Sequence, residues 1–405
     1  MRLFQEVYRP DAKVARFLGV LALSGIAYGL YKGVQDNYLA ELVHITPFER
    51  GVVEFFRELP GLLVVLILAV MYRFSESRIF KIGTALMVAG LAGLLAVGTG
   101  KFIVVLFMVI FSFGEHISMP VKTTISLDLA KREQAGAALG ITTSISQAGQ
   151  IAGFVIVTLL FFIFSRVGFV RGDPRQFKVI YALGTALVTA AVLVSLAMQE
   201  TTLKSGRRRF YFARKFFKYY MLEVFYGARK QVFLTFAPYV LIKQYGADTS
   251  VVSLLLGICA GFGAALGSPM GKLIDRLGYK FIMVTDTLVL VVVCMLYGFA
   301  HRIFPAPVAF MVVCVNFVLD SIISLASMAS NVYVQRIAQN SEEVTATLST
   351  GVSVNHLISI LIALMGGWIW ELTGIEVLFS ISAFLGILNS IYAATINVEK
   401  EEVRR

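Results

Sequence analysis

Long apolar runs separated by short polar connections make up most of the chain. A helix of about 20 apolar residues crosses the hydrocarbon core of a bilayer, so each run predicts one transmembrane helix. The runs lie near residues 14–42, 50–72, 79–99, 102–125, 138–165, 176–198, 217–242, 249–270, 279–300, 306–330, 345–370 and 373–396. The pattern predicts an all-α polytopic membrane protein of about twelve helices, with no stretch long enough for a separate soluble domain.

The second run has a defined start. Thr46-Pro47-Phe48-Glu49 forms a capping box with proline at the first helical position. We expect this sequence to end the first span and to begin the second. Further along the same run, we expect Pro60-Gly61 to break the helix.

Composition supports the membrane assignment and changes how the charge is interpreted. The chain is 58% hydrophobic and 15% charged, whereas a soluble domain has roughly 25% charged residues. The net charge of +11 does not indicate nucleic-acid binding, because the basic residues lie in short clusters between apolar runs, as in cytoplasmic loops. Cys259, Cys294 and Cys314 all lie within apolar runs, and their spacing defines neither a disulfide framework nor a metal site.

The distribution of lysine and arginine predicts the orientation. If the N-terminus is cytoplasmic, most basic residues fall on the cytoplasmic side, which predicts a multi-pass protein of the cell inner membrane with both termini in the cytoplasm. The largest basic group lies in the connection at 200–218, interleaved with aromatic residues: Lys204, Arg207, Arg208, Arg209, Arg214, Lys215 and Lys218. This pattern favours a segment that binds anionic lipids at the membrane surface.

The central connection divides the chain into two halves, residues 1–199 and 219–405, each predicted to form a six-helix bundle. A short repeat relates the halves. Tyr28-Gly29-Leu30-Tyr31-Lys32 in the first span recurs as Tyr226-Gly227-Ala228-Arg229-Lys230 in the seventh. Two bundles related by a pseudo-twofold axis would place this pattern at one depth, so we expect Lys32 and Lys230 to face a central cavity.

A charged, glycine-containing motif lies between the eighth and ninth spans, at 271–280. Two glycines permit a tight turn, and the aspartate can cap a helix or pair with a basic residue. The residues are Gly271, Asp275, Arg276, Gly278 and Lys280. They match the Gly-x-x-x-Asp-Arg-x-Gly-x-Lys/Arg motif of the cytoplasmic loops of the major facilitator superfamily, which the chain resembles. The corresponding connection of the first half, at 72–81, lacks the aspartate and both glycines.

The resemblance implies a monomeric secondary transporter that works by alternating access. Lys32 and Lys230 also resemble, in position, the basic residues that organophosphate–phosphate antiporters of this superfamily carry on spans one and seven. Those proteins have arginine there. A lysine binds an anion as a point charge and not as a bidentate fork, so the expected solute is anionic or zwitterionic and not specifically a phosphate.

Ionisable residues inside the spans are the candidates for function, because each costs about 2.5–3.5 kcal/mol at mid-bilayer. For substrate binding we select Tyr28, Lys32, Asp36, Tyr226, Arg229, Lys230 and Asn355. For proton coupling we select Asp36, Glu115, His116, Glu223 and Asp320. For gating we select Glu54, Arg57 and Glu58, together with the 271–280 motif. The alternative for each charged group is an ion pair that joins helices, and Arg57 has the spacing to reach Glu54.

The sequence contains no catalytic triad spacing, metalloprotease motif or phosphate-binding loop. We therefore expect neither an enzyme nor a cofactor or metal, and transport must use an ion or exchange gradient. Two functions remain open. One is a gradient-driven transporter, coupled to protons or to a counter-substrate. The other is a lipid or lysophospholipid flippase, or a non-transporting receptor, with the same fold.

Overall fold

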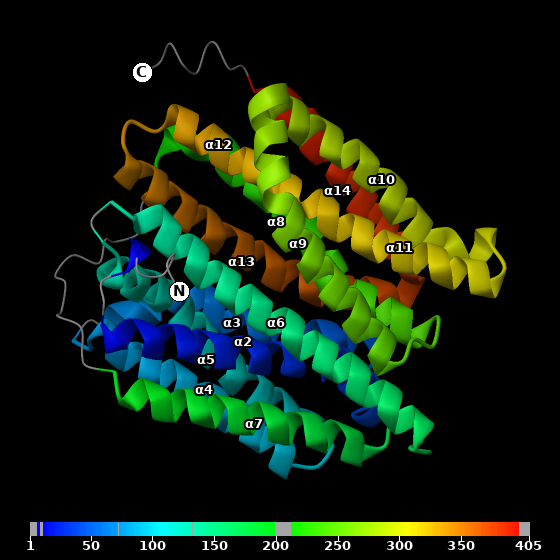
Figure 1. The fold of residues 1–405 in the computed structure, drawn as a ribbon. Coiled ribbons are helices and arrows are strands. Elements are labelled where there is room, and N and C mark those ends of the chain that lie inside the picture. Colours follow the sequence, from blue (N-terminus) through cyan, green and yellow to red (C-terminus); the bar gives the residue numbers. More distant parts are fainter. Residues whose placement is uncertain (1–5, 9–10, 72, 132, 199–211, 397–405) are drawn as a thin grey trace. The chain divides into compact units, whose positions relative to one another are not determined.

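The structure is a computed structural model that describes residues 6–8, 11–71, 73–131, 133–198 and 212–396. Helices form almost all of it, and the described residues contain no named strand, only an isolated bridge between Tyr8 and Ala130. The all-α membrane fold is confirmed (Figure 1). Of the basic central segment, Lys204, Arg207, Arg208 and Arg209 lie outside the described residues.

Each of the twelve predicted spans corresponds to a helix or to a continuous helical stretch. The first half contains α2 (Ala12–Asn37) with the π-helical turn η1 (Tyr38–Leu42), α3 (Pro47–Val70), α4 (Glu76–Ala96), α5 (Lys101–Leu129), α6 (Ala135–Arg166) and α7 (Pro174–Leu196). The second contains η2 (Arg214–Phe216), α8 (Phe217–Lys243), α9 (Thr249–Leu277), α10 (Tyr279–Ile303), α11 (Ala306–Ser324), η3 (Leu325–Ser327), α12 (Met328–Ile337), α13 (Ser341–Thr373) and α14 (Ile375–Ala394).

Ten of these stretches, within the described residues, are long and apolar enough to cross a membrane. The two remaining long helices are α3 and α8, with 24 and 27 residues. They have the necessary length, but α3 carries Glu54, Arg57 and Glu58, and α8 carries Glu223, Arg229 and Lys230. Polar residues within a transmembrane bundle mark pathways for solutes and ions, so α3 and α8 are the strongest candidates to carry a functional site.

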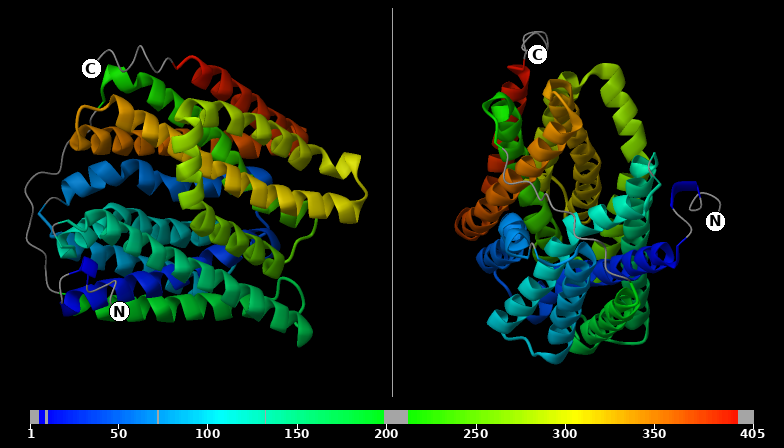
Figure 2. Two further views of the ribbon diagram at one scale, coloured as in Figure 1. Left: turned by 45° about the horizontal axis from the view of Figure 1, so that its top comes forward. Right: turned by 90° about the vertical axis from the view of Figure 1, so that its left-hand side faces the viewer.

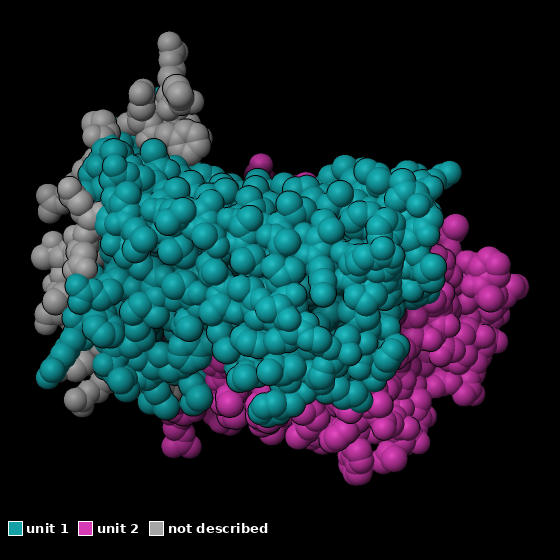
Figure 3. Space-filling view, turned by 90° about the horizontal axis from the view of Figure 1, so that it is seen from below, with its two compact units in different colours: residues 1–45, 63–207, 248–260 teal, residues 46–62, 208–247, 261–405 magenta. Residues whose placement is uncertain are grey.

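The chain forms two compact units, which Figure 3 shows in different colours. Unit 1 contains residues 1–45, 63–207 and 248–260, and unit 2 contains residues 46–62, 208–247 and 261–405. The division therefore passes through two helices. The first part of α3 belongs to unit 2, and the first part of α9 belongs to unit 1.

In unit 1, α2 packs against α6, and small residues allow the two backbones to approach closely (Figures 1 and 2). A Cβ atom at Gly29 would lie 2.2 Å from Gln150 O. On the same contact, a Cβ at Gly153 would lie 2.3 Å from Ile26 O. The first part of α9 also joins α6, because Ser253 Oγ donates a hydrogen bond of 2.9 Å to Phe154 O.

In unit 2, α8 packs against α13 in a corresponding way. A Cβ at Gly227 would lie 3.0 Å from Asn355 Nδ2. Gly29 and Gly227 are the glycines of the Tyr-Gly-x-x-Lys repeat. In each half of the chain, this glycine therefore lies where the first helix crosses the fifth. Close helix crossing is a known use of small residues in membranes, and it explains why the repeat conserves glycine at this position between the halves.

The first part of α3 packs against α13 within unit 2. A Cβ at Gly51 would lie 2.2 Å from Ala363 O. The predicted capping box is confirmed, because Thr46 N donates to Glu49 Oε2 at 2.9 Å and Glu49 N donates to Thr46 Oγ1 at 3.2 Å. Glu371 of α13 accepts two further hydrogen bonds here, from Thr46 Oγ1 and Phe48 N.

Two local expectations were wrong. Pro60-Gly61 does not break the second span, because α3 continues to Val70 with Pro60 inside it. Membrane helices tolerate a proline when their surroundings satisfy the freed backbone groups. The 271–280 motif also differs from the expected turn, because Gly271 and Asp275 lie within α9 and only Gly278, with φ of +84°, makes the turn. Gly278 itself is the N-cap of α10, so Asp275 cannot cap that helix.

Candidate functional site

Unit 2 contains a chain of polar contacts between α8, α12 and α13. Lys230 Nζ donates to Asn355 Oδ1 at 3.4 Å, and Asn355 Nδ2 donates to Glu223 Oε2 at 3.2 Å. The other carboxylate oxygen of Glu223 accepts a hydrogen bond of 3.2 Å from Ser330 Oγ. Three of the residues predicted for function are thus brought together around one amide.

The register of α8 explains this arrangement. Glu223 and Lys230 are seven residues apart, which places them on one face of the helix about two turns from each other. Gly227 lies between them on that face, and its missing side chain lets α13 bring Asn355 against α8. Asn355 is buried, whereas Lys230 is half-buried. A cation and an anion are thus held apart by a neutral amide that contacts both.

Arg229 does not join this group. Its side chain lies in the interior of unit 2, where Nη2 is 3.3 Å from Ser324 Oγ and the guanidinium interacts electrostatically with Asp286 and Asp320. The ring of Tyr226 lies 5.3 Å from the Arg229 guanidinium and 5.9 Å from Lys230 Nζ. The ring of Tyr226 is therefore within cation–π distance of both Arg229 and Lys230.

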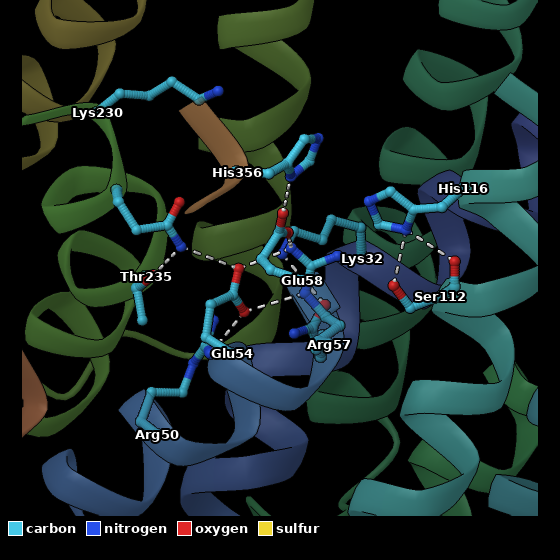
Figure 4. A network of polar contacts seen from close by, with 12 residues as sticks. Lys32, Arg50, Glu54, Arg57, Glu58, Ser112, His116, Lys230, Thr235 and His356 are labelled. Atoms are coloured by element: carbon cyan, nitrogen blue, oxygen red, sulfur yellow. Dashed lines mark hydrogen bonds and ion pairs between the residues drawn. The ribbon is translucent and has the colours of Figure 1, made fainter. Parts of the chain in front are cut away.

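A second network in unit 2 links α3, α8 and α13 (Figure 4). Glu54 accepts hydrogen bonds from Arg50 at 2.9 Å and from Arg57 at 2.7 and 3.0 Å. Gln231 Nε2 donates to Glu54 at 3.3 Å and to Thr235 Oγ1 at 2.8 Å.

Beyond Glu54 the network reaches α13. Arg57 also pairs with Glu58, and Glu58 Oε2 lies 2.9 Å from His356 Nδ1. The predicted reach of Arg57 to Glu54 is confirmed. Arg50 and Glu54 are fully buried, at 0% and 1% exposure, so the network joins helices and does not form a solvated face.

In unit 1, the predicted residues of the first span line one part of α2. Lys32 Nζ donates to Gln35 Oε1 at 3.1 Å, and Asp36 is buried one turn beyond. Tyr28 stacks on Phe111 of α5 with ring centroids 6.5 Å apart. The lysine of the repeat thus contacts a side-chain amide in both units. Lys32 contacts Gln35 on its own helix, and Lys230 of α8 contacts Asn355 of α13.

The predicted pair Glu115 and His116 lies on α5, but the two side chains have different surroundings. His116 is buried, and its Nδ1 lies 2.8 Å from Ser112 O and 3.1 Å from Ser112 Oγ. The carbonyl contact favours the tautomer with the proton on Nδ1. Glu115 is half-buried and interacts electrostatically with Lys122.

The residues of the 271–280 motif lie at the end of α9 and the start of α10. Asp275 and Arg276 are exposed. Lys280 Nζ donates to Ile396 O at 2.7 Å and so holds the end of α14. The motif therefore joins three helices of unit 2 at one end, through its turn glycine and its last lysine.

Several residues in these networks were not predicted from the sequence, among them Arg50, Gln231 and Asp286. Arg50 was overlooked because it lies in the first turn of α3, although its i,i+4 spacing to Glu54 is a usable signal. Gln231 is uncharged and Asp286 stands alone in the apolar run of α10, so neither stands out as part of a cluster of charges in the sequence.

Comparison with known proteins gives three results. Residues 219–404 match the family model of the Major Facilitator Superfamily. No curated protein matches the sequence significantly. Solved structures match almost the whole chain, at identities that show the fold alone.

The chain is similar to a mutant of the nucleoside transporter NupG, with a TM-score of 0.76 and 14% identity over 96% of this chain and 100% of that one. It is similar to the D-xylose-proton symporter, with a TM-score of 0.75 and 14% identity over 96% and 98%. It is also similar to a mutant peptide transporter POT in complex with sulfate, with a TM-score of 0.74 and 12% identity over 98% and 97%.

Proposed function

We propose that the chain is a secondary active transporter of the major facilitator superfamily, because residues 219–404 match the family model and the fold is similar to that of solved transporters. It moves a small anionic or zwitterionic organic solute across the membrane by alternating access, and protons drive it. We further propose that it is a monomer of the cell inner membrane. Its termini and the 200–218 segment face the cytoplasm, and residues 1–199 and 219–405 form its two bundles.

The observation that carries this proposal is the Lys230–Asn355–Glu223 chain in unit 2. A lysine and a glutamate within a membrane bundle are costly unless they are paired or used. Here they are separated by an amide, and the longest of these contacts is the one to Lys230, at 3.4 Å. An acidic group of a solute would be a better partner for the ammonium than an amide oxygen.

The repeat supplies a second binding group. Lys32 on α2 has the position in its half that Lys230 has on α8. Lys32 Nζ also donates to a neutral amide, Gln35 Oε1. Within its own unit, each lysine is a candidate partner for an acidic group of a solute, and each has a carboxylate on the same helix, Glu223 on α8 and Asp36 on α2, that suits the ammonium of a zwitterion.

The structural neighbours include nucleoside and peptide transporters and a xylose–proton symporter. Small polar solutes and proton coupling are therefore compatible with this fold. In the 200–218 segment, Lys215 pairs with Glu343 at 2.7 Å and Lys218 donates to Thr395 O. The proposed binding of anionic lipids therefore falls mainly to the remaining basic residues, Lys204, Arg207, Arg208, Arg209 and Arg214.

A thermal-shift screen of the purified protein tests the proposal. The ligands are organic phosphates, carboxylates, amino acids and lysophospholipids. A ligand that binds only the folded state stabilises it by about 2.7 kcal/mol at a concentration one hundred times its Kd. We expect stabilisation by one class of acidic or zwitterionic solute. Stabilisation by lysophospholipids alone would instead support a lipid-handling function and contradict this proposal.

A further inference from the structure

A second group of charged side chains lies in the interior of unit 2, on α8, α10 and α11. Arg229 is 4% exposed and Asp320 is 9% exposed, and the guanidinium interacts electrostatically with Asp320 and with Asp286. Asp286 Oδ1 also accepts a hydrogen bond of 3.0 Å from Thr287 Oγ1. The solute site described above does not use the two aspartates.

Polar atoms in this group lack partners. Among the described residues, Arg229 Nε, Arg229 Nη1 and Asp320 Oδ1 are buried and have no hydrogen-bond partner. A buried polar group without a partner destabilises the folded protein, and more so if it is charged. Arg229 thus has buried donors, and Asp320 a buried acceptor, that no described residue satisfies. This arrangement indicates a binding site for a small mobile species such as an ion.

The charges identify what is missing. Two ionised carboxylates and one guanidinium leave a net charge of −1 in the interior of a membrane bundle. Such a buried charge is destabilising, because it loses its hydration without a compensating partner. One proton on either carboxylate makes the group neutral, because the other carboxylate then balances Arg229. A metal cation would instead have to bind beside the fixed positive charge of the guanidinium, which repels it.

Among the described residues, Arg229 is the charged side chain whose electrostatic interaction with the two aspartates is resolved. Cys294 of α10 interacts electrostatically with Asp320 and Arg229, and its thiol lies 3.6 Å from Ser382 Oγ of α14. Also on α14, Asn389 Nδ2 lies 3.4 Å from Thr287 Oγ1. A thiol is ordinarily protonated at neutral pH, and neither Ser382 nor Asn389 titrates. The two aspartates are therefore the proton acceptors.

We propose that Asp286 and Asp320 together bind one transported proton, and that Arg229 holds whichever carboxylate stays ionised. The proton forms an O–H bond with a carboxylate oxygen, and no other bond changes. Each carboxylate interacts electrostatically with the same guanidinium, so a proton on either one leaves the other balanced by Arg229. This inference rests on the proposed transport function and names its coupling site.

The location of Arg229 connects this proton site to the solute site. Arg229 and Lys230 are consecutive on α8, and both lie against the ring of Tyr226. Protonation changes which carboxylate Arg229 balances. When protonation makes the guanidinium move from one carboxylate toward the other, the ring of Tyr226 and the backbone of α8 transmit this movement to Lys230.

Infrared spectroscopy of the full-length protein in liposomes tests the proposal without any solute. A protonated carboxyl has a carbonyl band separate from that of a carboxylate, and isotope-labelled aspartate distinguishes aspartates from glutamates. We expect the labelled band to be present at neutral pH. Asp286→Asn and Asp320→Asn should each remove this contribution, because the remaining carboxylate is then balanced by Arg229. Arg229→Gln should roughly double it, because both carboxyls must then be neutral.

Glu133→Gln is the matched control, since Glu133 is exposed in the connection between α5 and α6, and it should leave the band unchanged. The amide bands of the same spectra report whether each variant is folded. If an Asn variant does not fold, a double variant with both Asp286→Glu and Asp320→Glu keeps the charge count and should move the band out of the aspartate-labelled position.

Three results would overturn the proposal. They are the absence of the labelled band in the wild type, its full retention in either Asn variant, and its loss when choline is replaced by sodium, which would identify a metal cation as the ligand. None of these results depends on finding a solute. A failure of the transport proposal in the thermal-shift screen is therefore distinguishable from a failure of this one.

Discussion

His356 Nδ1 lies 2.9 Å from Glu58 Oε2, and this contact fastens α13 to the first part of α3. Through Arg57, Glu58 is joined to Glu54, and through Glu54 to Arg50. Two arginines and two glutamates therefore cancel one another's charge within unit 2. Each member is buried or nearly so, and removal of one leaves another without its counter-charge.

Glu54→Gln should lower the stability of the protein strongly. Glu54 is the partner of both Arg50 and Arg57, and Arg50 is fully buried. Breaking one member of a buried ion pair costs about 3–5 kcal/mol, because the other charge stays buried. The measurement is the free energy of unfolding, or the apparent Tm, of the purified protein in detergent.

Glu49→Gln is the control on the same helix. Glu49 forms the capping box with Thr46, and glutamine is also accepted at that position. It should cost much less than Glu54→Gln. Equal losses in the two variants would mean that the buried network contributes no more than a helix cap.

Lys32→Gln and Lys230→Gln should each weaken binding of the solute found in the screen by tenfold or more. Removing one partner of a buried charge pair costs about 2–5 kcal/mol, and about 1.4 kcal/mol corresponds to tenfold in Kd. Lys272→Gln is the control, since Lys272 is exposed on α9. Isothermal titration gives the three affinities. Normal binding by both lysine variants, with loss of binding in Arg57→Gln, would move the site to the α3 network.

Alanine substitution at the repeat glycines should separate packing from binding. A Cβ at Gly29 meets the backbone of Gln150 at 2.2 Å, so Gly29→Ala should destabilise the protein by about 1–3 kcal/mol. At Gly227 the new atom meets the side chain of Asn355 at 3.0 Å, so the amide should shift and solute affinity should fall more than stability.

Gly19→Ala provides the matched control on α2, because nothing lies within 4 Å of its Cβ position. Alanine is about 1 kcal/mol better than glycine inside a helix, so this variant should be as stable as the wild type or more stable. Thermal unfolding of the three variants checks the order. A Gly29→Ala protein as stable as Gly19→Ala would contradict the close α2–α6 crossing.

The orientation predicted from the basic residues can be measured in intact cells. A cysteine at Val170, which is 75% exposed in the connection between α6 and α7, should react with an impermeant maleimide added outside. A cysteine at Ser205, in the central connection, should react only after the membrane is opened. The reverse pattern would place both termini outside and contradict the positive-inside argument.

The fold could be read from the sequence because apolar length alone decides which segments can cross a membrane. Even α3 and α8, with their charges, were located correctly. The breaks were less predictable. Pro60 suggested an interruption of α3, but a helix packed among others keeps its course. Gly271 suggested a turn, yet only Gly278 has a positive φ.

The residues of the site were identified more reliably than their partners. An intramembrane charge is visible in the sequence, so Glu223, Arg229 and Lys230 could be selected. Which helix each one faces depends on tertiary packing, which one sequence does not contain. Arg229 and Lys230 are adjacent in the chain, but one contacts Ser324 and the other Asn355.

The two shared helices, α3 and α9, have a consequence for how the protein could be divided. If the halves were produced as separate chains, the surface of α13 around Ala363 would lose its packing against Gly51 of α3. The surface of α6 around Phe154 would likewise lose its contact with Ser253 of α9. Each fragment would then expose a helix surface that packs against a helix of the other fragment in the intact protein. Reassembly of a split protein would therefore require mutual recognition through these two half-helices, and the halves should be stable together but not alone.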